Sequence, residues 1–153
     1  MTNLIEPTEL WQFSVTSYQQ DELQNELLGW QNSYDGNVNL ALFCLYCDDL
    51  TIEISDQELT LLHNYISQFS RKFTQAIRVN RETFKQQKAQ INHYEDIRHH
   101  LLEAELLFEQ QEQSLLCDMM KRDAAEYRAD VSVPNNWGRY QALLIHTSNT
   151  DNK

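Results

Sequence analysis

The stretch NVNLALFCLYCDD, residues 37–49, decides the fold of this chain. Eight consecutive apolar residues fill its centre, between a polar start and two aspartates. Asn39 has a side chain typical of a helix N-cap, and Val38 and Phe43 have the spacing of a hydrophobic staple around that cap. A helix that is apolar on every side must be buried all round. The stretch therefore predicts a short central buried helix at 39–48.

Helical signals continue on both sides of this run. The 153 residues include only three glycines and two prolines, so the residues that usually separate strands and hairpins are scarce. Apolar residues recur at the helical period elsewhere. This period predicts helices at 8–18, 21–34, 94–128 and 137–145. It also predicts helix over 55–91, either as one long helix or as two with a kink near 79–80. We therefore expect an all-α fold, a single-domain bundle of about six or seven helices over residues 1–145, with a loose polar tail at 146–153.

Capping signals mark several of the predicted helix ends. Ser55 with Glu58 three residues later is a capping box. Asp21 has the side chain of an N-cap for the second helix. Gly36 is well placed to end that helix, because glycine adopts the left-handed conformation that other residues avoid.

Charge is distributed unevenly along the chain. Residues 1–70 contain eleven Asp and Glu and no Lys or Arg, whereas residues 71–153 contain twelve acidic and twelve basic residues. The formal net charge of −11 therefore comes entirely from the first half. Nucleic acid is not an expected partner, because duplex binding depends on a basic surface that neutralises phosphates.

The apolar segments are short. None approaches the roughly 18 consecutive apolar residues that a membrane span needs. The start of the chain, MTNLIEPTEL, lacks the basic and apolar regions of a signal peptide. The three cysteines are an odd number and fit reduced thiols better than a disulfide framework. We expect a cytoplasmic protein with no membrane span.

Three motifs together resemble a known family. They are LWQFSVTSY at 10–18, NVNLALFC at 37–44 and IRVNRETFK at 77–85. The chain resembles a family of small uncharacterised proteobacterial proteins that open on Leu-Trp-x-Phe-Ser, and it departs from them at Tyr46 and Ala76, where we expect tryptophan and proline. The resemblance implies a helical, cytosolic bacterial protein and supplies no catalytic residues.

A basic face is the first candidate site. Five cations fall within an arc of about 100° on the predicted helix. They are Arg71, Arg78, Arg81, Lys85 and Lys88. This face either docks internally against the acidic first half of the chain, through arginine–carboxylate pairs, or binds an anion or an acidic protein partner. Internal docking is the favoured alternative, because a chain without cations in its first 70 residues needs compensation.

A carboxylate cluster offers an alternative. Asp48, Asp49 and Glu53 follow the apolar run in a pattern similar to the acidic motif of helical isoprenoid synthases such as squalene and phytoene synthases, which hold magnesium diphosphate. That resemblance implies a metal- or diphosphate-binding enzyme. Against it, no second acidic motif faces the first, and Leu45 replaces an arginine.

Two further patterns have simpler interpretations. Cys44 and Cys47 form a C-x-x-C pair, but they lie in the last turn of an apolar helix and are expected to be buried and inert. One helix carries Asp96, His99, His100 and Glu103, a single copy of a spacing that di-iron bundles use twice. We therefore expect no cofactor, and we predict a non-catalytic binding or adaptor module that acts through the basic face or the acidic half.

Overall fold

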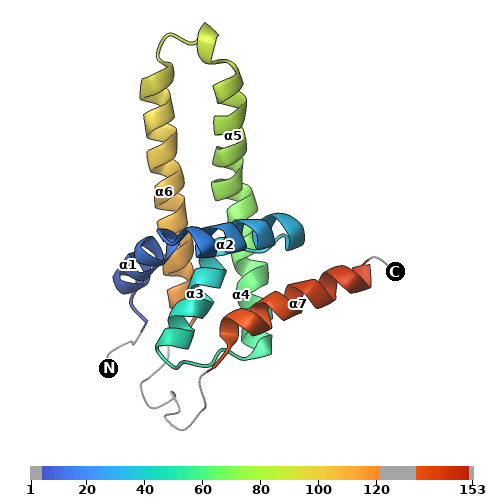
Figure 1. Ribbon diagram of the computed structural model, residues 1–153. Helices are drawn as coiled ribbons and strands as arrows, with labels where there is room; N and C mark the ends of the chain where they lie inside the picture. Colours follow the sequence, from blue (N-terminus) through green and yellow to red (C-terminus); the bar gives the residue numbers. More distant parts are fainter. Residues whose placement is uncertain (1–4, 121–133, 152–153) are drawn as a thin grey trace.

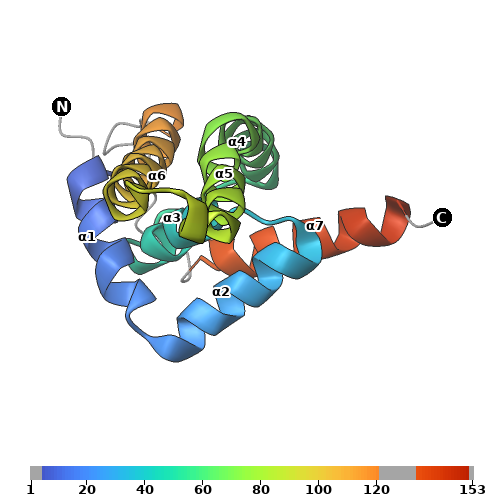
Figure 2. The same cartoon turned by 90° about the horizontal axis from the view of Figure 1, so that it is seen from above.

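The computed structural model describes residues 5–120 and 134–151, and α3 (Val38–Asp49) lies at its centre. Five other helices contact α3. They are α1 (Pro7–Tyr18), α2 (Asp21–Tyr34), α4 (Asp56–Phe69), α6 (Tyr94–Met119) and α7 (Asn136–Asp151). Seen from above, they surround it on all sides (Figure 2). The all-α fold and the central buried helix are therefore confirmed.

The core gathers around α3. Its residues Leu40, Phe43, Cys44 and Cys47 are fully buried, with side chains from every surrounding helix packed on them. All three cysteines are buried. Burial raises the pKa of Cys44 well above its ordinary value, so the thiol is held in its unreactive protonated form.

The start of α3 differs from the prediction. Asn37, not Asn39, is the N-cap, and its side-chain oxygen accepts a 2.8 Å hydrogen bond from the Leu40 amide. The predicted staple of Val38 and Phe43 is therefore wrong as well, because the helix begins two residues earlier. The shift frees the Asn39 side chain, which lies on the first turn of α3 and contacts α6.

The end of α2 also corrects a prediction. Asp35 holds the left-handed conformation, with a φ of 54°, and Gly36 does not have a positive φ. Gly36 is required for a different reason. A Cβ at this position would lie 2.1 Å from the ring of Trp30, so the loop can cross the indole only without a side chain. Asp21 is the first residue of α2, and Gln20 precedes it as the N-cap.

A single column of helix runs from α4 to α5. The Ser55–Glu58 capping box that starts it is confirmed. Its irregularity is a π-helical segment, Ser70–Thr74, rather than the predicted kink near 79–80. Such π segments bulge the backbone and often occur at functional sites. The column continues as α5 (Gln75–Gln86).

The column and α6 form an arm. A short 3₁₀ turn, Lys88–Gln90, connects α5 to α6, and the two helices extend side by side beyond the other helices (Figure 1). Phe84 and Tyr94 stack near the tip with ring centroids 4.9 Å apart. In the described part of the chain, α6 ends at Met119, and the rest of the predicted helix to 128 lies outside the described residues.

The last helix is longer than predicted. It runs from Asn136 to Asp151 and so continues past residue 145 into the segment predicted as a tail. It packs against α3, α2 and α4. None of the helices in residues 5–120 and 134–151 is both long and apolar enough to cross a membrane.

Candidate functional site

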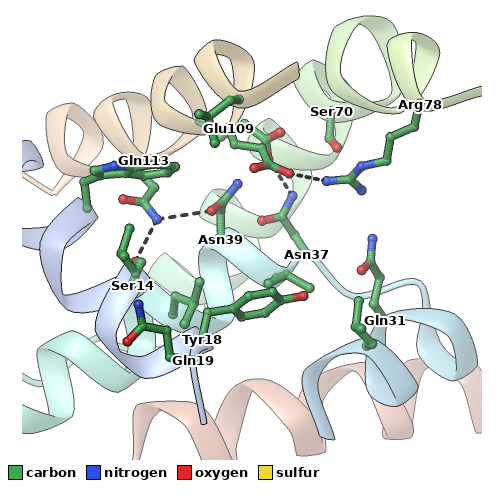
Figure 3. A pocket seen from close by; sticks show the side chains of 17 residues that line it. Ser14, Tyr18, Gln19, Gln31, Asn37, Asn39, Ser70, Arg78, Glu109 and Gln113 are labelled. Carbon is green, nitrogen blue, oxygen red and sulfur yellow. Dashed lines mark hydrogen bonds and ion pairs between the residues drawn. The ribbon is translucent and has the colours of Figure 1, made fainter. Parts of the chain in front are cut away.

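A cavity of about 320 Å³ opens where the arm joins the other helices. Residues of α1, α2, α3 and α6 line it, together with Ser70 of the π segment and Arg78 of α5 (Figure 3). Val15, Leu28 and Leu106 line it and are also exposed, so the cavity is accessible from solvent. The volume is at the lower end of the range of about 300–1,000 Å³ typical of small-molecule sites.

The buried carboxylate of Glu112 lies at the cavity wall. Its side chain is only 1% exposed. Its Oε1 accepts a 2.9 Å hydrogen bond from Asn37 Nδ2, and its Oε2 accepts one from the Thr74 hydroxyl of the π segment. Both donors are neutral, and none of the ion pairs among the described residues involves Glu112. A buried carboxylate without a cation is uncommon, because burial penalises the charged form.

A hydrogen-bond chain leads from Asn37 to α4. The Asn37 amide donates to the Tyr140 hydroxyl at 3.2 Å, and that hydroxyl lies 2.6 Å from His63 Nδ1. Burial lowers the pKa of His63, which favours the neutral ring. In the tautomer that leaves Nδ1 without a proton, the Tyr140 hydroxyl donates to His63 Nδ1. Five residues, from α4, α6, α7, the N-cap of α3 and the π segment, thus share one network.

This network predicts acid sensitivity. The pKa of His63 is lower in the folded protein than in the unfolded chain. Between these two pKa values the unfolded chain binds more protons, so the free energy of unfolding decreases as the pH falls. Urea unfolding between about pH 7.5 and 5.5 should show a larger loss of stability for the wild type than for His63→Gln, whose side-chain oxygen can still accept from Tyr140. Equal losses of stability in the two proteins would show that protonation of His63 does not cause the acid sensitivity.

Gln113 forms a second polar contact at the cavity. Its Nε2 donates to Ser14 Oγ at 2.8 Å and to Asn39 Oδ1 at 3.2 Å, and Figure 3 shows both bonds. The side chain is 1% exposed, and its Oε1 has no hydrogen-bond partner. An unpaired buried acceptor costs about 1–3 kcal/mol, so a donor at this position would stabilise the protein.

Arg78 and Arg81 of the predicted basic face dock internally, but their partners lie on α6. Arg78 binds Glu105 at 2.9 Å and Glu109 at 2.6 Å, and Arg81 binds Glu105 at 3.0 Å. The predicted partner, the acidic first half of the chain, is therefore wrong for these two residues. Burial raises the pKa of Glu109, although the Arg78 guanidinium opposes this shift.

Arg78→Gln should lower stability by about 1–2 kcal/mol, because Glu105 and Glu109 lose charge-assisted bonds in a half-buried setting. Lys85→Gln, on the exposed side of the same helix, is the matched control and should change stability by less than about 0.5 kcal/mol. Thermal unfolding measures both. An Arg78 variant as stable as the control would contradict internal docking.

The remaining cations of the basic face are exposed. Arg71, Lys85 and Lys88 all face solvent. Lys88 lies 3.9 Å from Glu95 and 5.4 Å from the ring centroid of Tyr94. The five predicted binding residues are therefore divided, and among them Arg78 alone lines the cavity.

Asp48 has a structural partner. Its two carboxylate oxygens accept from the first amides of α7, Asn136 at 2.7 Å and Trp137 at 3.3 Å. A carboxylate at a helix N-terminus is favoured by the exposed amides and the helix dipole. Burial nevertheless raises the pKa of Asp48. The carboxylate therefore anchors α7 to the end of α3.

The alternative metal site predicted at Asp48, Asp49 and Glu53 does not have the geometry of a metal site. Asp49 and Glu53 are exposed, and Asp48 is committed to α7. His99 and His100 contact Glu103 on the exposed face of α6, at 2.9 and 3.7 Å. Over residues 5–120 and 134–151, no three His, Cys, Asp or Glu side chains group closely enough to hold a metal ion.

The sequence analysis did not predict the most buried polar residues of the site. Glu112 and Gln113 lie in a polar, glutamine-rich part of α6 that resembles a solvated face, and Tyr140 resembles an ordinary core aromatic. Their partners are 38 to 103 residues away in the chain. The local signal that could have indicated them is that Glu112 and Gln113 interrupt the apolar periodicity of α6.

Comparison with known proteins gives the family. The family model described as Protein of unknown function (DUF2390) matches residues 9–116. The chain belongs to the DUF2390 family. This finding confirms the predicted membership of a family of uncharacterised proteins. All residues that line the cavity lie within the DUF2390 segment, whereas α7 lies outside it. Searches of curated proteins and of solved structures found no match.

Proposed function

We propose that this protein is a non-catalytic binding protein that holds a small molecule in the cavity between α1, α2, α3 and α6. The observation that supports this most strongly is the cavity itself, which combines an accessible apolar rim with fully buried polar side chains. Small-molecule sites have this composition, with a few convergent polar groups on a mainly apolar wall.

The polar wall is held in place before any ligand binds. Gln113 is fixed by Ser14 and Asn39, and Glu112 by Asn37 and Thr74. A preorganised site binds more tightly because it loses less conformational entropy on binding. The π segment that supplies Thr74 and Ser70 also fits a binding site, since such backbone irregularities accompany function.

A binding function is favoured over catalysis by the chemistry of the lining groups. Both carboxylates at the cavity, Glu109 and Glu112, have hydrogen-bond donors as partners. The cavity lining contains no cysteine or histidine to serve as nucleophile or base. The Ser14 hydroxyl donates to the Leu10 carbonyl at 2.8 Å and accepts from Gln113, so its described partners do not include a base that would activate it.

A cavity-filling variant tests the proposal. Ligand-observed NMR with a mixture of small cationic, neutral and anionic organic compounds should reveal binding to the wild-type protein. Val15→Trp, which places an indole in the cavity from its rim, should abolish that binding. Thr16→Trp, at an exposed position that does not line the cavity, is the matched control and should bind like the wild type.

The proposal fails if no compound class binds to the wild-type protein. It also fails if binding persists unchanged in Val15→Trp, because the ligand would then occupy another surface. Circular dichroism of both tryptophan variants verifies that they are folded.

A protein partner for the exposed basic residues is the second candidate. Arg71, Lys85 and Lys88 stay exposed, and the ion pair of Lys88 with Glu95 is exposed as well, so an acidic protein can reach these three cations. Replacing all three with glutamate would remove such a partner and leave small-molecule binding in the cavity unchanged.

A further inference from the structure

We propose that the ligand of this cavity is a primary amine in its ammonium form, attached to a compact apolar body. The proposal rests on the proposed function and names the ligand class of the same site. It is argued from the balance of donors, acceptors and charges at the cavity wall.

Acceptor atoms that can take further hydrogen bonds line the buried end of the cavity. Glu112 has two carboxylate oxygens, each with further lone pairs beyond the single hydrogen bond it accepts. Gln113 Oε1 is buried without a partner. An ammonium group has three donors and no acceptor, so its chemistry matches that of a wall with acceptors that can take further hydrogen bonds.

The local charge also favours a cation. Arg78 and Arg81 form ion pairs with Glu105 and Glu109, so the two positive and two negative charges of these side chains cancel. Glu112 then adds one negative charge that no described cation compensates. An anionic ligand would have to approach this carboxylate in a partly desolvated site, which is strongly unfavourable.

Arg78 does not reverse this preference. Its Nε and Nη2 atoms donate to Glu105 and Glu109, so two carboxylates already compensate its positive charge. The other walls of the cavity come from α1, α2 and α3, and residues 1–70 contain no Lys or Arg. The surrounding field is therefore negative and attracts cations.

The apolar part of the wall suits the body of the ligand. Trp11, Val15, Leu28, Leu42 and Leu106 line the cavity and provide aromatic and aliphatic contact surface. An aromatic face next to a cation adds a further attraction. The ligand therefore inserts its ammonium group toward Glu112 and leaves its apolar body near the rim.

Three probes of the same shape test the ligand class. Cyclohexylmethylammonium, cyclohexylmethanol and cyclohexanecarboxylate are titrated into the full-length protein by calorimetry at neutral pH. The amine should bind at least about tenfold more tightly than the alcohol, since a charge-assisted hydrogen bond is worth this much, and the carboxylate should not bind.

Glu112→Gln then tests the residue. This variant keeps the shape of the side chain and removes its charge, so amine affinity should fall about tenfold while alcohol affinity is unchanged. Glu95→Gln, an exposed position outside the cavity, is the control and should leave both affinities unchanged. Comparison of the three probes on the wild-type protein tests the class even if the Glu112 variant does not fold.

The outcomes separate the two proposals. Binding of the alcohol or the carboxylate as tight as that of the amine would overturn the amine assignment and leave the proposed function intact. An amine affinity that Glu112→Gln does not alter would also overturn it. Absence of binding by all three probes, together with no binder in the wider NMR mixture, would overturn the proposed function itself.

Discussion

Replacement of Glu112 by leucine is expected to destabilise the protein by about 2–5 kcal/mol, because two buried donors lose their acceptor at once. Asn37 Nδ2 and the Thr74 hydroxyl both donate to this carboxylate, and neither has another acceptor among the described contacts. Asn37 is also the N-cap of the central helix, so its disturbance reaches the core. Urea unfolding followed by far-UV circular dichroism measures the loss.

Glu112→Gln is the matched control for this prediction. Its oxygen can still accept from Asn37, and the Thr74 hydroxyl can rotate to accept from its amide. The loss should therefore be about 1 kcal/mol or less, since the hydrogen-bond count is preserved. A leucine variant as stable as the glutamine variant would show that the buried network does not stabilise the fold.

Asn136→Ala is expected to cost about 2–4 kcal/mol, because it leaves a buried backbone amide and a buried carbonyl without partners. Asn136 is fully buried. Its Nδ2 donates to the Ile52 carbonyl at 2.7 Å, and its Oδ1 accepts from the Ile54 amide at 2.9 Å. The side chain thus pairs with the extended segment before α4 in the way a neighbouring strand would.

The loss from Asn136→Ala should be visible at α7 itself. Trp137 packs edge-on against Trp30 with ring centroids 5.0 Å apart, so near-UV circular dichroism reports loosening of the helix. Asp56→Ala is the control, because it removes the exposed contact of Arg139 at the same junction and should cost at most about 1 kcal/mol. Equal losses in the two variants would contradict the role of Asn136.

Local patterns in the sequence predicted the helices well. The capping box at Ser55 and the uniformly apolar run of α3 depend on neighbours within one or two turns, and both are found as predicted. The apolar run also gave the central position of α3, because a helix without a polar side can lie only where other helices cover it.

Features that depend on distant segments could not be predicted in this way. Gly36 was expected for its backbone freedom, but it is needed because the ring of Trp30 occupies the space of its Cβ. Asn37 caps α3 in place of the predicted Asn39, and Glu112 and Tyr140 hold Asn37 from 75 and 103 residues away.

The partners of the side chains in the candidate site could not be predicted either, because they also lie on distant segments. Charge patterning correctly indicated that the arginines need carboxylate partners, but Glu105 and Glu109 on the facing helix are closer than the acidic first half. Once these pairs form, the most unusual charge in the described chain is Glu112, which is buried and has only neutral donors. The functional question therefore moves from the exposed basic face to the cavity.

A crystal structure of the protein with 4-bromobenzylammonium tests the central claim most directly, because the anomalous signal of bromine locates the ligand independently of any variant. We predict the bromine among the apolar rim residues, with the ammonium nitrogen about 3 Å from a Glu112 oxygen. An empty cavity at a saturating concentration of the ligand, or bromine found only outside the cavity, would contradict the account.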